Sequence, residues 1–431
     1  MISLFWHRRD LRIHDNVGLY KALRSGQKVQ AVFIFDRNIL SKLPQNDQRI
    51  LFIHQEVTRL KEEYIRLGAD LIVLFGDPCE LIPQLANRLN ASKVFTNRDY
   101  EPYALERDKI VYEKLKQQGV ELIGAKDHVI FEKNEVLKKD GTPYTVFTPY
   151  SRKWKEKLNE FYLSSYPTEN YLKELCLTSR TELISLKKLG FESNQVHAFP
   201  PREFPLTTIS SYNETRDFPS INGTSKLSLH LRFGTISIRE LARIAIEKNP
   251  TYLNELIWRD FYQMIIYHFP HSAKDAFKKQ YDQINWEKNE QHFKAWCDGK
   301  TGYPLVDAGM RELNATGFMH NRVRMVVASF FSKHLLLDWR LGEAYFAEKL
   351  LDYELASNIG GWQWAAGCGC DAAPYFRVFN PTSQQEKFDK DFTYIKKWIP
   401  EYGTNKYPSP IVEHKMARER AIARYQQALK V

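Results

Sequence analysis

The hydrophobic pattern of this chain changes once along its length, and that change limits the folds open to it. Up to about residue 130, amphipathic helical stretches alternate with short apolar, β-rich runs at 3–6, 29–35, 70–76 and 93–96. Continuous apolar strands between helices are typical of a parallel sheet covered on both faces. The helical stretch 48–67 is followed by Gly68, a residue that commonly ends a helix. We therefore expect residues 1–130 to form a Rossmann-like α/β domain.

Beyond residue 130 the strand signal fades. Residues 131–200 carry scattered charge and turn pairs such as Asp140-Gly141, which predicts a connector with some helix. From about Ser225 the hydrophobic periodicity is helical almost throughout, for example at 237–248, 253–268, 306–315, 321–337 and 343–351. We expect residues 201–431 to form a larger, all-α domain.

The chain combines a positive surplus with many aromatic side chains. Its net charge is +10, and 13% of its residues are aromatic, including nine tryptophans. Positive charge favours polyanions because phosphate contacts release counterions, and aromatic rings stack on bases or on a flat cofactor. The composition therefore favours nucleic acid as a partner, and a generic basic surface is the alternative.

Several protein classes are disfavoured by the sequence. No apolar run reaches the roughly 18 residues that a membrane helix needs, and the N-terminus lacks the features of a signal peptide. We expect a soluble, cytoplasmic protein without membrane contact. Five cysteines argue against a disulfide framework, and Cys368 and Cys370 lack a second pair that would complete a zinc site. No metal is predicted. The first domain contains neither a G-x-G-x-x-G motif nor a P-loop.

A helix start precedes the helical half. In the stretch 223–234, Thr224 or Ser225 is expected to cap a helix that ends at Gly234. Hydroxyl groups and free N–H groups at a helix start also suit an anion. Simple capping is the plainer interpretation of this stretch.

Two later helices place chemical groups on one face. Glu255 and Trp258 are three residues apart, so a carboxylate lies beside a large stacking surface that suits a splayed base. Asn321 and Met325 are four apart, and they offer paired hydrogen bonds and a soft contact to a planar ring. A core tryptophan and a surface helix are the structural alternatives.

The segment 352–367 mixes polar residues, two adjacent glycines and two tryptophans in an apolar region. Glycine lets backbone approach something flat. Buried polar groups need a partner, and a ligand is one such partner.

Taken together, the motifs resemble the photolyase/cryptochrome family, and most closely its bacterial class I cyclobutane pyrimidine dimer photolyases. The segments that carry the resemblance are W-H-R-R-D-L-R-I-H-D-N at 6–16, T-S-K-L-S at 224–228, N-E-L-I-W-R-D-F-Y at 254–262, K-T-G-Y-P-L-V-D-A-G-M-R-E-L at 300–313, F-M-H-N-R-V-R-M at 318–325, N-I-G-G-W-Q-W-A-A-G at 358–367 and D-A-A-P-Y-F-R-V-F-N-P at 371–381. The resemblance implies light-driven repair of cyclobutane pyrimidine dimers in UV-damaged DNA.

The resemblance also implies non-covalent FAD in the helical domain, with Asn358 beside flavin N5. The positions that match the family's cofactor residues are Tyr212, Thr224, Ser225, Leu227, Ser228, Glu255, Arg259, Asn321, Asp352, Glu354 and Asn358. Trp286, Trp339 and Trp362 match the family's three-tryptophan electron relay. With Glu255 and Asn358, these tryptophans are the expected catalytic residues.

The implied DNA and lesion contacts are Arg216, Glu255, Trp258, Asn321, Arg322, Arg324, Met325 and Trp364. Met325 cannot titrate, which argues against a (6-4) photolyase, since those members of the family use histidines.

The resemblance implies a second, antenna chromophore as an option. Tyr103 and Ala104 stand where folate-binding members carry Asn and Glu, so folate, a deazaflavin, a second flavin and an empty site all stay open. The alternatives are a cryptochrome-type light sensor and a non-catalytic helical nucleic-acid-binding protein. We expect a monomer.

Overall fold

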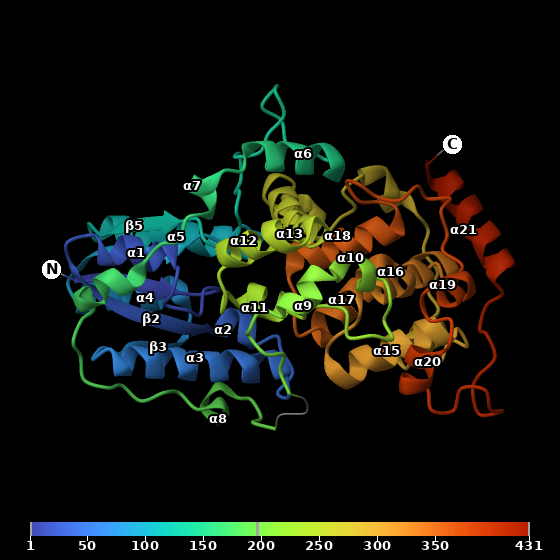
Figure 1. Cartoon of the computed structure of the whole chain (residues 1–431), viewed down its shortest axis with the longest axis horizontal. Coiled ribbons are helices and arrows are strands. Elements are labelled where there is room, and N and C mark those ends of the chain that lie inside the picture. The colour runs from blue at the N-terminus through green and yellow to red at the C-terminus, as the bar shows by residue number, and fades with distance from the viewer. Residues whose placement is uncertain (1, 195–197, 430–431) are drawn as a thin grey trace. The chain divides into compact units, whose positions relative to one another are not determined.

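The computed structural model describes residues 2–194 and 198–429, and the chain divides into two compact units (Figure 1). The α/β unit comprises Met1–Glu135, Lys155–Phe204 and Lys226–Glu247. The helical unit comprises Val136–Trp154, Pro205–Ser225 and Lys248–Val431. This division differs from the expected boundaries at 130 and 200, because much of the expected connector belongs to the α/β unit. Residues 195–197 of that connector lie outside the described residues.

The α/β unit is built on one parallel sheet. Its strands are β1 (Ile2–His7), β2 (Lys28–Asp36), β3 (Leu71–Gly76), β4 (Ala91–Asn97) and β5 (Glu121–Ala125). They pair in the order β3-β2-β1-β4-β5, all parallel. The four strands expected from the sequence are confirmed. Strand β5 lies at the sheet edge and is only partly buried, so it lacks the continuous apolar run by which a buried strand is recognised.

Helices cover both faces of this sheet. On one face Leu4 and Val32 pack in a core with Ile82 of α4 (Pro78–Arg88) and Val111 of α5 (Pro102–Gln117). Side chains alternate along a strand, so His7 is on the other face. There the His7 imidazole Nε2 hydrogen-bonds the hydroxyl of Tyr64 at 2.8 Å, which lies in α3 (Gln48–Arg66). The expected Rossmann-like architecture is confirmed.

Among the described residues of the stretch Lys248–Val431, the helical unit holds six α-helices of nine or more residues. They are α13 (Pro250–His268), α15 (Pro304–Thr316), α16 (Asn321–Ser329), α17 (Trp339–Lys349), α18 (Leu355–Ala366) and α21 (His414–Leu429). Helix α13 begins after Asn249, whose side chain accepts hydrogen bonds from the backbone N–H groups of Thr251 and Tyr252. Within the described part of the chain, no helix is long and apolar enough to cross a membrane.

Among the described residues, the remaining helices have 4 to 11 residues. They are α1 (Val17–Leu23), α2 (Arg37–Leu40), α6 (Phe147–Lys157), α7 (Glu160–Leu163), η1 (Thr168–Glu174), α8 (Leu186–Leu189), α9 (Leu206–Ser210), α10 (Tyr212–Thr215), α11 (Ser228–Phe233), α12 (Ile238–Lys248), η2 (Pro270–Ala273), η3 (Lys279–Gln283), α14 (Glu290–Cys297), η4 (Phe330–His334), α19 (Pro381–Phe388) and α20 (Thr393–Trp398).

Two helix boundaries differ from the expectation. Helix α11 begins at Ser228 and its N-cap residue is Leu227, which makes no side-chain cap hydrogen bond. The expected cap by Thr224 or Ser225 is wrong, because Lys226 adopts a φ of 54° and turns the chain just before the helix. The expected stop at Gly234 is confirmed. A Cβ there would lie 2.1 Å from the carbonyl oxygen of Arg9, so only glycine fits.

The second difference is in α16, which the periodicity extends to residue 337. The α-helix ends at Ser329, and a π-helical turn follows over Phe330–His334. Within it the Ser332 hydroxyl donates to the carbonyl oxygen of Ala328 at 2.8 Å, and such bonds bend helices. Leu336 then adopts a φ of 52°, which ends the helical path.

Candidate active site

An ion pair joins α13 to the start of α18. The Arg259 guanidinium donates to Glu354 Oε1 at 3.1 Å, and both side chains are almost fully buried. Glu354 is the N-cap residue of α18 and also accepts from the Ser357 hydroxyl at 3.0 Å. Burying two charges is costly unless their geometry compensates, so such pairs often mark functional positions. Two of the expected cofactor residues are therefore brought together.

The glycines of α18 have different surroundings. A Cβ at Gly360 would lie 2.3 Å from the ring of Tyr262, so this glycine allows α18 and α13 to pack closely. A Cβ at Gly361 would meet no heavy atom within 4 Å. Gly361 is three residues after Asn358, so both lie on one face of α18. This face is therefore open at Gly361, and a group from outside the chain can approach α18 there.

The Asn358 amide is held from α17. Its Nδ2 donates to Glu343 Oε1 at 2.9 Å and to the Glu343 carbonyl oxygen at 3.3 Å. Burial raises the pKa of Glu343, while hydrogen bonds from Asn358 and Tyr353 oppose that rise. Glu343 was not expected from the sequence, because nothing in its local pattern shows that it meets α18.

A buried amide in α13 supports a polar ligand. Gln263 follows Arg259 by one helical turn and is 2% exposed. Neither its amide oxygen nor its amide nitrogen has a hydrogen-bond partner among the described residues. Buried amides are almost always bonded. A polar ligand or ordered water would satisfy the Gln263 amide, which lies on the same face of α13 as Arg259.

Only some of the residues expected on the adenine and phosphate side of the FAD lie close to one another. The Ser225 hydroxyl hydrogen-bonds the Tyr252 hydroxyl at 2.8 Å. The ring of Tyr212 meets the ring of Tyr252 edge-on, with centroids 5.1 Å apart. Thr224 is half-buried next to Ser225. Of the other two expected residues, both of which belong to the α/β unit, Leu227 is buried and Ser228 is exposed.

A line of alternating charges begins at Glu255. Arg216 donates to Glu255 Oε1 at 2.5 Å, and its Nε lies 3.9 Å from Asp217 Oδ1. Asp217 also accepts from Arg322 at 2.5 Å. Burial raises the pKa of Glu255, an effect that Arg216 opposes and Asp217 reinforces. Asp217 was not expected, although it adjoins Arg216 in the sequence.

Helix α16 carries the residues expected beside the lesion. Asn321 is exposed at its first position, and Met325 is half-buried one turn later. The Met325 sulfur lies 4.0 Å from an Nη atom of Arg322. Arg324 is paired with Asp352, with Nη2 and Oδ2 3.1 Å apart. The two expected site residues Arg324 and Asp352 are thus in contact.

Trp258 is covered on one side by a residue from the expected connector. Its ring stacks on that of Phe147 at 3.6 Å between centroids and 4° between planes. The Phe147 backbone N–H donates to Asp371 Oδ2 at 2.9 Å. Phe147 was not expected, because no periodic pattern links this segment to α13.

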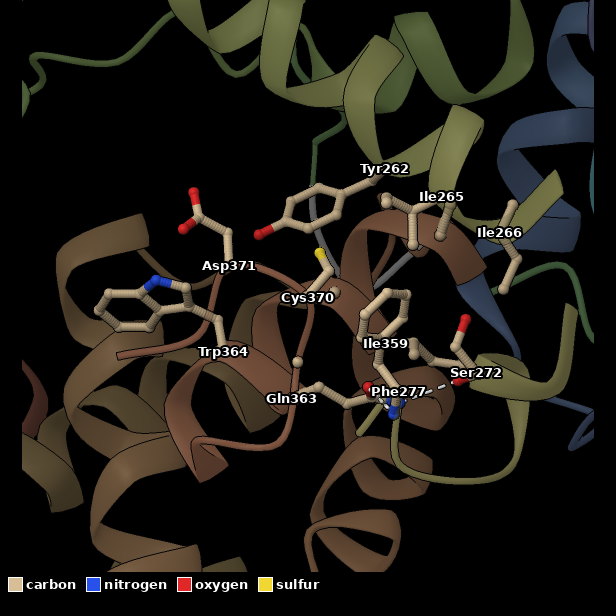
Figure 2. A pocket seen from close by; sticks show the side chains of 13 residues that line it. Tyr262, Ile265, Ile266, Ser272, Phe277, Ile359, Gln363, Trp364, Cys370 and Asp371 are labelled. Carbon is tan, nitrogen blue, oxygen red and sulfur yellow. Dashed lines mark hydrogen bonds between the residues drawn. The ribbon is translucent and has the colours of Figure 1, made fainter. Parts of the chain in front are cut away.

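Trp364 borders an apolar recess between α13 and α18, whose space of about 380 Å³ includes part of the open solvent at its mouth (Figure 2). Tyr262, Ile359 and Cys370 are among its other lining residues. Gln363 also lines it, but its amide accepts from the Phe277 N–H and donates to the Ser272 and Asp275 carbonyl oxygens. That amide is therefore structural, and the recess offers mainly apolar contact.

The three expected relay tryptophans lie in or against one aromatic core. Trp362 and Trp339 are each 2% exposed, and Trp286 is half-buried against the same core. Trp362 contacts the ring of Trp296 at 6.0 Å between centroids. Trp286 contacts the ring of Tyr425 at 6.0 Å. Trp296 is fully buried and was not expected as part of this group.

In the α/β unit, Tyr103 fills space at the end of β2. Its hydroxyl donates to Asp36 Oδ2 at 2.6 Å. The Arg107 guanidinium lies 5.0 Å from the ring centroid of Trp6 and 5.7 Å from that of Tyr103. The chain's own side chains thus occupy part of the carboxyl edge of the sheet.

Comparison with known proteins matches both halves of the chain. Residues 3–170 match the family model for DNA photolyase, and residues 252–405 match the model for the FAD binding domain of DNA photolyase. The deoxyribodipyrimidine photo-lyase of Synechococcus sp. is 38% identical, over 98% of this chain and 96% of the relative.

Solved structures show the same likeness. A bacterial class III photolyase from Agrobacterium tumefaciens has a TM-score of 0.89 and 33% identity, covering 100% of this chain and 98% of its own. An archaeal photolyase from Sulfolobus tokodaii with two FAD molecules has a TM-score of 0.80 and 32% identity, covering 99% of this chain and 100% of its own. The chain therefore belongs to the DNA photolyase family.

Proposed function

We propose that this protein is a light-driven, FAD-dependent deoxyribodipyrimidine photo-lyase that splits cyclobutane pyrimidine dimers in UV-damaged DNA. The observation that carries the proposal is the open face at Gly361, bordered by Asn358 and located on the helix that Arg259 ties down through Glu354. The proposal is supported by relatives of that name, which are 34% to 38% identical over almost the whole chain.

When bound, FAD supplies the absorption of light and the single electron that opens the cyclobutane ring. The Arg259–Glu354 pair fixes the start of α18 against α13. This sets the position of the Asn358 amide relative to α13. The Asn358 contact with Glu343 keeps that amide from rotating. Ser225 and Tyr212 would hold the far end of the cofactor.

The lesion would lie beside Glu255, Trp258, Met325 and Trp364. Trp258 is a rigid stacking platform because Phe147 supports its ring. The Glu255 carboxyl is the group that hydrogen-bonds a pyrimidine edge, and Arg216 keeps its Oε1 in place. Arg322 and Arg324, with Asn321, would contact the lesion strand. A lesion that is already poorly paired is cheaper to flip out than an intact base; photolyases are a known example of base flipping.

The antenna site stays open between folate, a deazaflavin, a second flavin and no chromophore at all. The Sulfolobus tokodaii photolyase was solved with two FAD molecules, which supports a flavin as one candidate. Tyr103, which stands where a folate-binding member carries Asn, disfavours folate. A monomeric state and a cytoplasmic location stay predictions.

The test uses the full chain loaded with FAD and chemically reduced without oxygen. An oligonucleotide with one cyclobutane thymine dimer is illuminated with near-UV light, and intact thymines are counted by chromatography. The expected result is repair in the light and none in the dark. A matched oligonucleotide with a (6-4) product should stay unrepaired.

Two other outcomes would contradict the proposal. If the protein retained flavin that could be photoreduced but did not repair the dimer, the result would favour a cryptochrome-type sensor. A colourless protein that binds DNA but retains no flavin after refolding with FAD would favour a non-catalytic binding protein.

A further inference from the structure

A lysine is buried in the helical unit next to a partly exposed loop. Lys333 is 1% exposed and lies in the π-helical turn Phe330–His334. Burial of an ammonium group is unfavourable unless a partner compensates it. Its Nζ donates to the backbone carbonyl oxygen of Arg377 at 2.8 Å, the only hydrogen bond that the Lys333 side chain makes among the described residues. Turns of this kind are frequent at functional sites.

The loop it contacts runs from Asp371 to Asn380 and contains neither helix nor strand. Its first residue, Asp371, is tied to the Phe147 N–H. Further along, Tyr375 stacks on Tyr425 with ring centroids 6.1 Å apart and 11° between planes. The carbonyl of Arg377 is fixed by Lys333. The polar anchor from Lys333 therefore restrains the outer part of the loop.

That outer part displays groups suited to a nucleic acid. Phe376 is 56% exposed, and the Arg377 side chain is also exposed. An exposed aromatic ring stacks on a base, and a guanidinium beside it contacts a phosphate. A loop ordered before binding loses less entropy when its partner arrives, which strengthens the complex.

We propose that Lys333 is a positioning residue that holds the loop Asp371–Asn380 in place to contact the DNA strand beside the lesion. Lys333 acts through the Arg377 carbonyl and touches neither the lesion nor the reacting atoms. The inference rests on the proposed function, because that function makes DNA the ligand.

The charge of Lys333 gives the anchor a pH dependence. Burial lowers the pKa of Lys333 to about 8, with Cys368 opposing the shift and Arg377 adding to it. Burial raises the pKa of Cys368, and burial and nearby cations hold the pKa of His334 at about 3. Both neighbours are thus uncharged from pH 7 to pH 9. Lys333 is the group in this cluster that loses a proton near pH 8, and a neutral amine is a weaker donor.

The experiment compares Lys333→Met with Lys415→Met. Lys415 is exposed on α21, so its replacement removes the same charge without touching the loop. For each FAD-loaded protein we would measure dark binding to a dimer-containing oligonucleotide, flavin content, melting temperature, and repair per absorbed photon at saturating DNA.

For Lys333→Met we expect a Kd about tenfold higher, which corresponds to the loss of one charge-assisted hydrogen bond. Flavin content and melting temperature should not fall, since methionine removes a buried charge. Repair per photon at saturation should change by less than about twofold, because a positioning residue affects binding and not the electron transfer. Lys415→Met should bind as the wild type does.

The wild type provides a second measurement. Its affinity for the dimer should fall as the pH rises from 7 to 9.5, and Lys333→Met should lack this fall. An unchanged Kd in a folded Lys333→Met protein would overturn the proposal, while wild-type repair would leave the proposed function intact. If Lys333→Met does not fold, a flat wild-type affinity over this pH range would overturn it instead. Absence of wild-type repair alongside a pH-dependent Kd would count against the proposed function and not against the anchor.

Discussion

Asn358 and Glu343 are joined by a hydrogen bond of 2.9 Å between the amide Nδ2 and the carboxyl Oε1. The bond links α18 to α17 at the edge of the open face beside Gly361. Since Asn358 is expected beside flavin N5, the carboxyl group that orients it is placed to influence the redox state of the cofactor.

Replacement of Glu343 with Leu removes this side-chain acceptor and leaves the Asn358 amide with the longer, 3.3 Å bond to the backbone carbonyl oxygen of residue 343, so the amide is held less firmly. We expect reduced flavin to be less favoured by about fivefold in the redox equilibrium, as the loss of one ordinary hydrogen bond predicts. Spectroelectrochemical titration of the FAD-loaded protein measures this. Glu343→Gln keeps an acceptor oxygen and is the control. Equal midpoint potentials in all three proteins would show that the contact does not influence the flavin.

The relay assignment gives a second prediction. Trp362→Phe should slow photoreduction of oxidised FAD by about tenfold or more, since phenylalanine is a far poorer electron donor. The same variant should still repair dimers when it is reduced chemically beforehand. Trp296→Phe is the informative comparison, because its ring contacts Trp362 but it is not one of the expected relay residues. If photoreduction depended on Trp296 and not on Trp339, the electron relay would run through Trp296 in place of Trp339. Transient absorption after a laser flash measures each rate.

The motifs and the family resemblance supply the expected site residues, and particular contacts show where the sequence stops being informative. The three-residue spacing predicts that Glu255 and Trp258 share one helix face, and the resemblance assigns them to the lesion pocket. Phe147 and Glu343 were not found, because each meets its partner only after distant segments pack together. The start of α11 was misplaced because Lys226 takes a left-handed backbone conformation that capping residues upstream do not reveal.

A pair formed by buried His334 and half-buried His414 makes acid stability testable. His334 Nε2 and His414 Nδ1 are 2.8 Å apart. Burial, with the nearby His414, Arg420 and Lys333, lowers the pKa of His334 to about 3 from 6.5. Between these two values the unfolded chain binds more protons than the folded one. The stability that neutral His334 contributes is therefore complete above about pH 6.5 and is lost as the pH falls toward 3.

We expect His334→Gln to flatten the decline in the free energy of unfolding below pH 6.5, since its amide does not titrate. The wild type should lose up to about 1.4 kcal/mol more than the variant per pH unit in this window. Urea unfolding from pH 7.5 to pH 4.5 measures both curves. Parallel curves would mean that His334 does not titrate as its burial indicates.

The two glycines of α18 form a matched pair for testing the cofactor face. A side chain at Gly361 enters open space, whereas one at Gly360 collides with the Tyr262 ring. Gly361→Val should leave the apoprotein folded with a melting temperature near that of the wild type, yet reduce flavin occupancy by about tenfold or more, because the branched side chain takes the space of the ring. Gly360→Ala should instead lower the melting temperature of the apoprotein, since overpacking typically costs about 1–3 kcal/mol.

The ratio of flavin to protein absorbance after refolding with excess FAD, read together with the apoprotein melting curve, separates the two effects. Full flavin occupancy in a folded Gly361→Val protein would mean that the flat group lies elsewhere, and the cradle on α18 would have to be abandoned.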